Sequence, residues 1–306
     1  MSLLEKQGWI WMDGEFVAWK DAKVHALTHT LHYATGVFEG LRAYEAKNST
    51  AIFRLEAHTE RLFRSAHLLN IKIPYTHEEL IQAQLETVRI NNVKSAYVRP
   101  LVYSGAESLG LRARGLKIHV MIASWEWGAY LGAEGIANGI RVCTSSYTRN
   151  HPNSVLSKAK ACGNYMNSIL ALHDAQSCGF DEALLLDTQG FVTEGSAENF
   201  FLIRKGVIYT PEPTAILEGI TRDTIFVLAR EMGYRVEEKR ITRDEVYLAD
   251  EAFFTGTAAE VTPIRELDGR PIGTGTRGPI TQQLQEAYHA LVHGESGKHD
   301  DWLSYI

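Results

Sequence analysis

The stretch Ser157-Lys158-Ala159-Lys160-Ala161-Cys162-Gly163-Asn164-Tyr165 lies near the middle of the chain and places a lysine among small residues, directly before a Gly-Asn helix start. A lysine in a confined site, where burial or a neighbouring positive charge favours its neutral amine, is a nucleophile. Lysines are mostly exposed, so this segment alone also fits a solvated surface residue. Lys158 competes with Lys160 for any special role.

Three segments downstream carry polar groups suited to a ligand. Residues 193–199 (TEGSAEN) place two acids in a turn between apolar strands, where a carboxylate could keep a ligand's ring nitrogen protonated. In residues 217–223 (LEGITRD), Gly219 allows close approach and Thr221 is expected to cap a helix whose N-terminus could bind phosphate. Residues 254–260 (FTGTAAE) could form an anion-binding nest. A polar hairpin in which Glu198 bonds its own turn, an ordinary capped helix and a strand turn are the simpler alternatives.

Two features upstream need separate interpretation. On an expected helix over 55–69, Glu60 explains Arg64 through an ion pair, whereas Arg61 lies beside the apolar stripe and needs an anion, which a phosphate could supply. His25, His29 and His32 have spacings that could suggest a metal site. No carboxylate or cysteine completes the set, and Leu27, Leu31 and Tyr33 alternate as in a strand. The sequence therefore predicts no metal.

The chain is expected to form two domains. Residues 1–130 predict a small α/β domain with a hairpin at 9–19, helices at 55–69 and 78–91, and strands at 95–102 and 116–124. The glycine- and alanine-rich residues 131–139 are interpreted as the connection. Residues 140–306 predict the larger domain, which carries Lys160. Its expected elements are helices at 163–179, 221–232 and 279–293 and strands at 140–146, 251–255 and 260–264.

Composition limits the classes of protein. The net charge of −6 and the pI near 6.1 provide no basic stripe for nucleic acid. No stretch approaches the ~18 uninterrupted apolar residues of a membrane span. Three cysteines without paired spacing favour a reducing compartment, and a cytoplasmic location is expected.

The motifs become specific in combination and order. The runs 160–165, 194–199, 219–223 and 256–260 together resemble the class IV, fold-type IV pyridoxal 5′-phosphate (PLP) aminotransferases. The runs 32–40 (HYATGVFEG), 97–100 (YVRP) and 127–132 (WGAYLG) are similar to the branched-chain amino acid aminotransferases within that family. The resemblance extends over roughly residues 9–293.

The resemblance implies a fold and an activity. The fold would be α/β (α+β), with a smaller N-terminal α/β domain, a larger C-terminal pseudo-barrel domain and PLP at their interface. The activity would be reversible, ping-pong transfer of the amino group of L-leucine, L-isoleucine or L-valine to 2-oxoglutarate. Other class IV enzymes remain alternatives: D-amino acid, aromatic or amine transaminases and aminodeoxychorismate lyases. A non-enzymatic binding protein on the same scaffold is the distant one.

The resemblance also implies residue roles. Lys160 would form the Schiff base with PLP and shuttle the proton, Tyr165 would meet the phenolic oxygen, and Glu194 the ring nitrogen. The remaining cofactor contacts would come from Arg61, Leu217, Gly219, Ile220, Thr221, Gly256 and Thr257, with Leu217 packed on the ring and the others at or near the phosphate. The substrate would meet Tyr33, Phe38, Gly40, Tyr97, Arg99, Tyr130, Ala258 and Ala259, with Arg99 gripping the distal carboxylate of glutamate.

Assembly and departures complete the expectations. Leu109 and Leu111 would reach a neighbouring subunit's site, which implies at least a homodimer, with a hexamer as an open alternative. Ala34 and Cys162 stand where the family often has glycine, and Glu218 stands where it often has proline. None of the three removes a reacting group.

Overall fold

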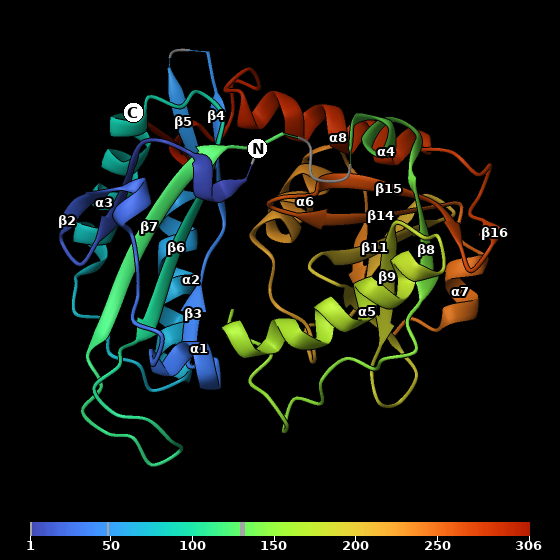
Figure 1. Cartoon of the computed structure of the whole chain (residues 1–306). Helices are drawn as coiled ribbons and strands as arrows, with labels where there is room; N and C mark the ends of the chain where they lie inside the picture. The colour runs from blue at the N-terminus through green and yellow to red at the C-terminus, as the bar shows by residue number, and fades with distance from the viewer. Residues whose placement is uncertain (1, 48, 129–131) are drawn as a thin grey trace. The chain divides into compact units, whose positions relative to one another are not determined.

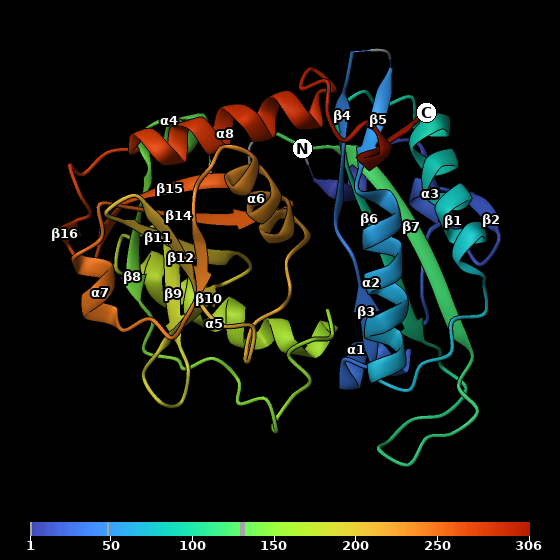
Figure 2. The same cartoon turned by 180° about the vertical axis from the view of Figure 1, so that it is seen from behind.

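The computed structural model describes residues 2–47, 49–128 and 132–306, and the chain divides into two compact units. Unit 1 comprises Met1–Trp127, Ala159–Gly163 and Val292–Ile306, and unit 2 comprises Gly128–Lys158 and Asn164–Leu291. Figures 1 and 2 show the elements of both units from opposite sides. Within the described ranges, no helix has the length and apolar character needed to cross a membrane.

Unit 1 is built on an antiparallel sheet in the order β17-β5-β4-β6-β7-β1-β2, with β3 paired to β6. The hairpin expected at 9–19 is confirmed, because Asp13 and Gly14 take the positive φ angles of a tight turn. The strands are β1 Trp9–Met12, β2 Glu15–Ala18, β3 Gly36–Phe38, β4 Leu41–Glu45, β5 Thr50–Phe53, β6 Ala96–Ser104, β7 Ile118–Glu126 and β17 Leu303–Tyr305.

Two long helices cover one face of this sheet: α2 (Leu55–Leu68) and α3 (His77–Asn91) (Figure 2). Both agree with the apolar periodicity of the sequence. Thr76 and Glu79 form a reciprocal capping box at the start of α3. Leu62 of α2 and Leu80 of α3 are fully buried in the same apolar cluster, which also contains side chains of β6 and β7. Burial of these helix faces therefore fixes α2 and α3 on the sheet.

The segment around the three histidines is helical, so the strand-like alternation of Leu27, Leu31 and Tyr33 is misleading. Helix α1 spans His29–Tyr33 and ends at Ala34, which takes the left-handed conformation at φ 56°. Tertiary hydrogen bonds decide its structure: the His29 amide donates to the Gly105 carbonyl. Five residues provide too little local pattern to reveal a helix fixed in this way.

Unit 2 contains a closed ring of strands in the order β10-β9-β8-β15-β14-β11, completed by pairing between β10 and β11. This ring is the expected pseudo-barrel, and the expected fold class is confirmed. Strands β12, β13 and β16 extend it at its margins. The strands are β8 Ile140–Thr144, β9 Glu182–Leu186, β10 Val192–Gly195, β11 Asn199–Arg204, β12 Val207–Thr210, β13 Val236–Glu238, β14 Glu251–Gly256, β15 Glu260–Leu267 and β16 Arg270–Pro271.

Five helices accompany these strands in the described part of unit 2. One of them, α4, occupies the glycine-rich segment for which the sequence predicts a plain connection. The others agree with the expected positions to within a few residues. The helices are α4 Gly132–Asn138, α5 Tyr165–Ser177, α6 Ile220–Glu231, α7 Arg243–Tyr247 and α8 Pro279–Val292.

The division into units differs from the expected domain boundaries in two places. The segment Ala159–Gly163 belongs to unit 1, because Ala161 forms a β-bridge with Val37. The C-terminal segment also belongs to unit 1, since β17 pairs with β5. Both assignments depend on pairing between segments far apart in sequence, which a local glycine-rich signal cannot reveal.

Candidate functional site

Lys160 is held firmly within unit 1. Its carbonyl accepts from the Phe38 amide at 3.0 Å, and its own amide donates to the Ser65 hydroxyl at 3.0 Å. The Lys160 Nζ lies 5.1 Å from the centroid of the Phe38 ring, and the side chain is half-buried. Lys158, in unit 2, donates instead to the Pro213 carbonyl and pairs with Glu218 at 3.3 Å. The structure thus separates the two lysines: Lys160 lies over an aromatic ring and Lys158 serves a loop.

The anion that Arg61 needs is present in the chain, and sequence reasoning missed it. Glu39 is fully buried, and its carboxylate accepts from Arg61 Nε at 2.5 Å and Arg61 Nη2 at 2.9 Å. The same carboxylate accepts from His58 Nδ1 at 2.7 Å and from the Gly40 amide at 3.2 Å. This set of residues, Glu39, Gly40, His58 and Arg61, is called the Glu39 cluster below.

Electrostatics explain why a charge is tolerated there. Burial alone would raise the pKa of Glu39, but the positive charge of Arg61 and the hydrogen bonds from His58 and Arg61 hold that pKa well below its usual range. Burial lowers the pKa of His58, against the opposing pull of Glu39. His58 is therefore a neutral donor at pH 7, and the charged pair is Glu39 with Arg61. The cluster fixes the direction of the Arg61 guanidinium.

Four predicted substrate residues come together beside Lys160 in unit 1. The Arg99 guanidinium lies 4.7 Å from the Phe38 ring centroid, and its Nη2 donates to the Tyr97 hydroxyl at 3.2 Å. A Cβ on Gly40 would lie 1.9 Å from that hydroxyl, so only glycine leaves room for Tyr97. An aromatic wall behind Tyr97, made of Trp125 and Trp127 at 5.3 and 5.0 Å between ring centroids, is not evident from the sequence.

Two other predicted substrate residues are not placed with this group. Tyr33 lies on α1, and its described ring contacts are with His29 and His32. Tyr130 lies outside the described residues. The histidines bond locally: His29 contacts Thr35 and the Gly110 carbonyl, and His32 contacts the Ala26 carbonyl. No group of three or more metal-binding side chains occurs among the residues that the structure describes.

In unit 2, Glu194 is the centre of a second group. It lies on β10 directly opposite Asn199 on β11, and only 4% of it is exposed. Arg149 Nη2 contacts Glu194 Oε1 at 2.8 Å, and Asn199 Nδ2 donates to Oε2 at 3.3 Å. Neither partner is identified by the sequence motifs. Glu198, the second acid of the motif, does accept from the amide of Ala197 in its own turn, as the simpler interpretation expects.

The start of α6 differs in detail from the expectation. Gly219 is the N-cap, without a side-chain hydrogen bond, and helix α6 begins at Ile220. Thr221 is therefore inside the first turn, and it does not cap the helix. The first amides of a helix have no acceptor within the helix and can bind an anion. Leu217 is tied to Glu194, because its amide lies 3.4 Å from Oε2.

The last predicted group follows β14. Residues 257–259 form the turn between β14 and β15. Asn199 pairs in register with Thr255 on β14, so Glu194, Asn199 and Thr255 form one row across β10, β11 and β14. Gly256 and Thr257 follow directly. Ala259 is buried, and its carbonyl accepts from Thr262. Tyr165 is the first residue of α5 and is half-buried.

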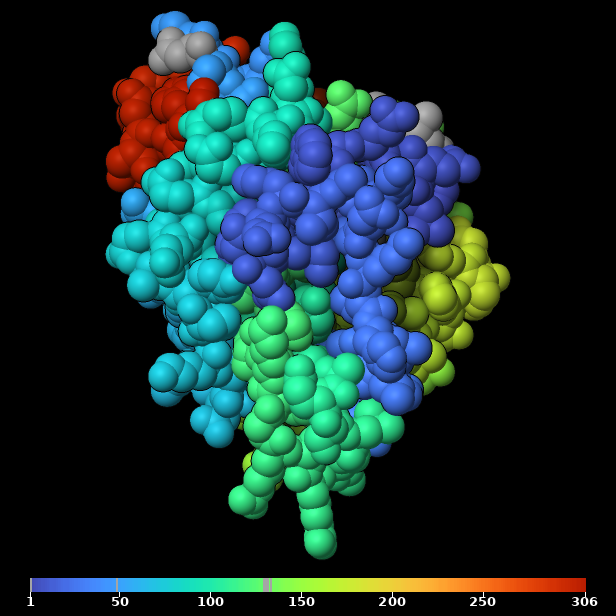
Figure 3. All heavy atoms as spheres, turned by 60° about the vertical axis from the view of Figure 1, so that its left-hand side comes forward, coloured from blue at the N-terminus to red at the C-terminus, as the bar shows by residue number. Residues whose placement is uncertain are grey.

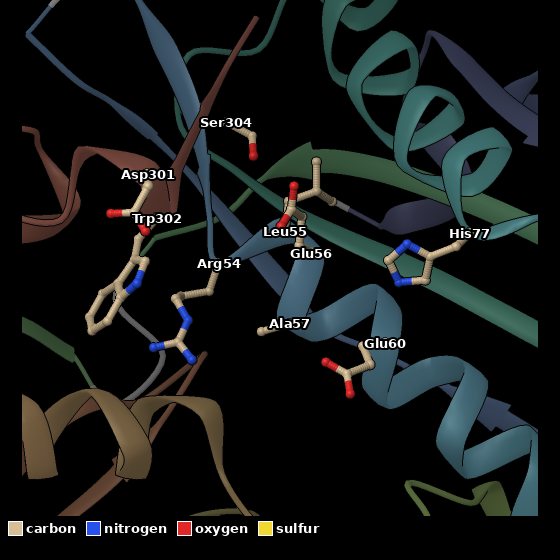
Figure 4. A pocket seen from close by; sticks show the side chains of 9 residues that line it. All are labelled: Arg54, Leu55, Glu56, Ala57, Glu60, His77, Asp301, Trp302 and Ser304. Atoms are coloured by element: carbon tan, nitrogen blue, oxygen red, sulfur yellow. The ribbon is translucent and has the colours of Figure 1, made fainter.

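A separate cavity of about 450 Å³ lies at the start of α2 (Figure 4). Its lining mixes Arg54 and His77 with the acids Glu56, Glu60 and Asp301. Arg54 lies 4.3 Å from the ring centroid of Trp302. No predicted site residue lines this cavity.

Comparisons with known proteins agree with these groups of residues. The Amino-transferase class IV family matches residues 36–267. A branched-chain-amino-acid aminotransferase of Pseudomonas aeruginosa is 60% identical over 306 residues, covering 100% of both chains. The crystal structure of a branched-chain amino acid aminotransferase from Escherichia coli is similar at 43% identity and a TM-score of 0.96, covering 98% of this chain and 99% of that one. A thermophilic relative's structure, complexed with N-(5′-phosphopyridoxyl)-L-glutamate, is 48% identical, with a TM-score of 0.93 and the same coverage.

Proposed function

We propose that this chain, which belongs to the class IV amino-transferase family, is a PLP-dependent branched-chain-amino-acid aminotransferase. It transfers the amino group of L-leucine, L-isoleucine or L-valine to 2-oxoglutarate, reversibly and by a ping-pong sequence. The observation that carries the proposal is the fixed amine of Lys160 over Phe38, with Arg99 stacked on the same ring. A nucleophilic amine, an apolar surface and a carboxylate-binding cation thus occur together in one unit.

The donor set of the chain fits PLP. When bound, PLP supplies the electron sink that makes the α-hydrogen of an amino acid acidic. Lys160 would hold the cofactor covalently and then, once released by the incoming amine, carry the proton to and from the substrate α-carbon. The fixed backbone of Lys160 supports this role, because both of its hydrogen bonds restrict where the amine can swing.

Glu194 is suited to the ring nitrogen. Its carboxylate is buried and is oriented by Arg149 and Asn199, so a ring N–H would meet a fixed acceptor. Tyr165, at the start of α5, would meet the phenolic oxygen. Leu217 would pack on the ring, since its backbone is tied to Glu194.

The phosphate would bind to amide groups and one guanidinium. The first turn of α6 offers the amides of Ile220 and Thr221, and the turn after Gly256 offers Thr257. Arg61 would supply the positive charge, and the Glu39 cluster supports this role by fixing the direction of its side chain. Gly219 keeps the approach to the helix free of a side chain.

The substrate pocket has to accept both an apolar and an acidic side chain. Phe38, Gly40 and Tyr97 would contact the branched-chain group, and Arg99 would pair with the distal carboxylate of glutamate. The amides of Thr257 and Ala258, with Ala259 beside them, would hold the α-carboxylate. The relative crystallised with a phosphopyridoxyl-glutamate adduct supports glutamate as one partner. Tyr33 and Tyr130 would complete the pocket.

A matched pair of lysine variants tests the central assignment. We expect Lys160→Ala to abolish transamination and the absorbance of lysine-bound PLP near the visible edge, because no other amine replaces Nζ. Lys158→Ala should keep both properties, since Lys158 serves Pro213 and Glu218. Multiple turnover by Lys160→Ala would refute the assignment. An amino-donor panel of L-leucine, L-isoleucine, L-valine and D-leucine with 2-oxoglutarate then tests the substrate class, and a preference for D-leucine would contradict it.

Assembly and location follow from other features. The connection between β6 and β7, residues 105–117, projects beyond the strand ends (Figures 1 and 3). It presents Leu109 at 47% exposure and Leu111 at 91%, which supports a homodimer in which these leucines contact a second copy. All three cysteines are free thiols, as suits the cytoplasm.

A further inference from the structure

Asn199 is a buried amide whose contacts connect two parts of unit 2. It begins β11, it is 5% exposed, and its backbone is in register with Glu194 on β10. Its Nδ2 donates to the Leu217 carbonyl at 2.9 Å and to Glu194 Oε2 at 3.3 Å. Both partners are pure acceptors, so the amide nitrogen must face them and the orientation of the side chain is chemically fixed.

The opposite end of the same amide faces the start of α6. A Cβ added to Gly219 would lie 2.0 Å from Asn199 Oδ1, so the amide oxygen packs directly against the Gly219 backbone. Gly219 is the N-cap of α6. One side chain therefore touches the carboxylate on β10, the loop before α6 and the cap of that helix.

We infer that Asn199 is a positioning residue that fixes the separation between two cofactor anchors: the Glu194 carboxylate and the amides at the start of α6. This inference rests on the proposed function. PLP is a rigid ring with its phosphate on a short arm, so the two anchors can serve it together only at one spacing. Two binding elements held at the matching distance gain affinity through effective concentration and preorganisation, without any new contact to the ligand.

The chemistry at position 199 is specific to an amide. Aspartate has the same shape, but it would lose both donors and bring a second negative charge to Glu194. Alanine would remove all three contacts. Asn199→Ala and Asn199→Asp therefore break the connection in different ways while leaving Glu194 and α6 in place.

The test compares a joined ligand with its separate parts. Full-length wild-type protein, Asn199→Ala and Asn199→Asp are freed of cofactor, and dissociation constants are measured for PLP, for pyridoxal, which lacks the phosphate, and for inorganic phosphate. The matched control is Phe200→Leu, because Phe200 is the next residue on β11, fully buried, with its side chain on the opposite face. Melting temperatures of all variants are recorded.

We expect both Asn199 variants to weaken PLP binding about tenfold or more, while pyridoxal and phosphate each change by less than about twofold. Separate fragments can each settle on their own anchor, whereas PLP must satisfy both. Equal weakening of PLP and pyridoxal would overturn the inference, since Asn199 would then serve Glu194 alone. The same PLP loss in Phe200→Leu at a comparable melting temperature would also overturn it. If wild-type protein binds PLP and transaminates but the Asn199 variants bind PLP normally, only this inference fails. If wild-type protein does not bind PLP, the proposed function fails as well.

Discussion

The Glu39 cluster allows a quantitative prediction for Glu39→Gln. The carboxylate accepts four donors: Arg61 Nε on Oε1, and Arg61 Nη2, His58 Nδ1 and the Gly40 amide on Oε2. A glutamine has one acceptor oxygen, which is best used at the Oε2 position, so its amino group then faces Arg61 Nε. Removing one partner of a buried ion pair costs about 3–5 kcal/mol. We expect Glu39→Gln to lose a similar amount of unfolding free energy at pH 7.

The pH dependence follows from the lowered pKa of Glu39. A carboxyl whose pKa is lower in the folded than in the unfolded state stabilises the fold above its usual pKa of 4.5, and this contribution is lost as pH falls toward the lowered value. Urea unfolding of wild type and Glu39→Gln should therefore differ by a constant amount between about pH 6 and 8, and the difference should shrink below about pH 4.5.

Glu45→Gln is the matched control. Glu45 pairs with Lys94 at 2.8 Å, but both side chains are mostly exposed, so stability should stay close to that of wild type. The reasoning would be refuted if Glu39→Gln lost less than about 1 kcal/mol at pH 7, the range of an exposed pair. A difference between wild type and Glu39→Gln that grew on acidification would refute the sign.

Three further predictions concern specificity, strain and assembly. Arg99→Ala should reduce kcat/KM for glutamate at least about tenfold more than for leucine, because only glutamate presents a second carboxylate; equal losses would contradict a shared pocket. Ala34→Gly should raise the melting temperature by about 2 °C, because Ala34 is held at φ 56° and a left-handed alanine costs about 1 kcal/mol; a lower melting temperature would show that the turn is unstrained. Leu111→Glu should shift the protein toward monomers in sedimentation velocity, since the residue is 91% exposed and would place a charge in the proposed dimer contact; an unchanged sedimentation coefficient would exclude Leu111 from the contact.

Much of the fold can be predicted because local patterns determine it. The apolar stripe of α2 and the turn between β1 and β2 are visible in a few adjacent residues. Helix α1 escapes prediction because hydrogen bonds to distant backbone decide its structure, and five residues cannot show a reliable period. The predicted capping position of α6 is also wrong: a threonine is a common cap, but the preceding glycine packs so closely on Asn199 that it takes this place.

The site is predictable in its reacting groups and not in their supports. Lys160 and Glu194 can be identified because they occur in ordered motifs. Arg61 is expected to meet an anion, but Glu39 is not recognisable as that anion, since its motif identifies it only as a polar residue between apolar ones. Arg149 gives no signal, because nothing in its neighbourhood reveals that Glu194 lies within 2.8 Å. Partners of this kind are set by strand pairing between remote segments.

The five residues Ala159–Gly163 belong to unit 1, although the chain on both sides of them belongs to unit 2. The nucleophile is thus an insertion of one unit's chain into the other unit's structure. A cut in the glycine-rich segment would yield an N-terminal fragment without its lysine and a C-terminal fragment whose lysine has lost Phe38 and Ser65. Neither piece could evolve or be exchanged as an active module, so shuffling between relatives should preserve activity only when residues 1–127 and 159–163 come from the same parent.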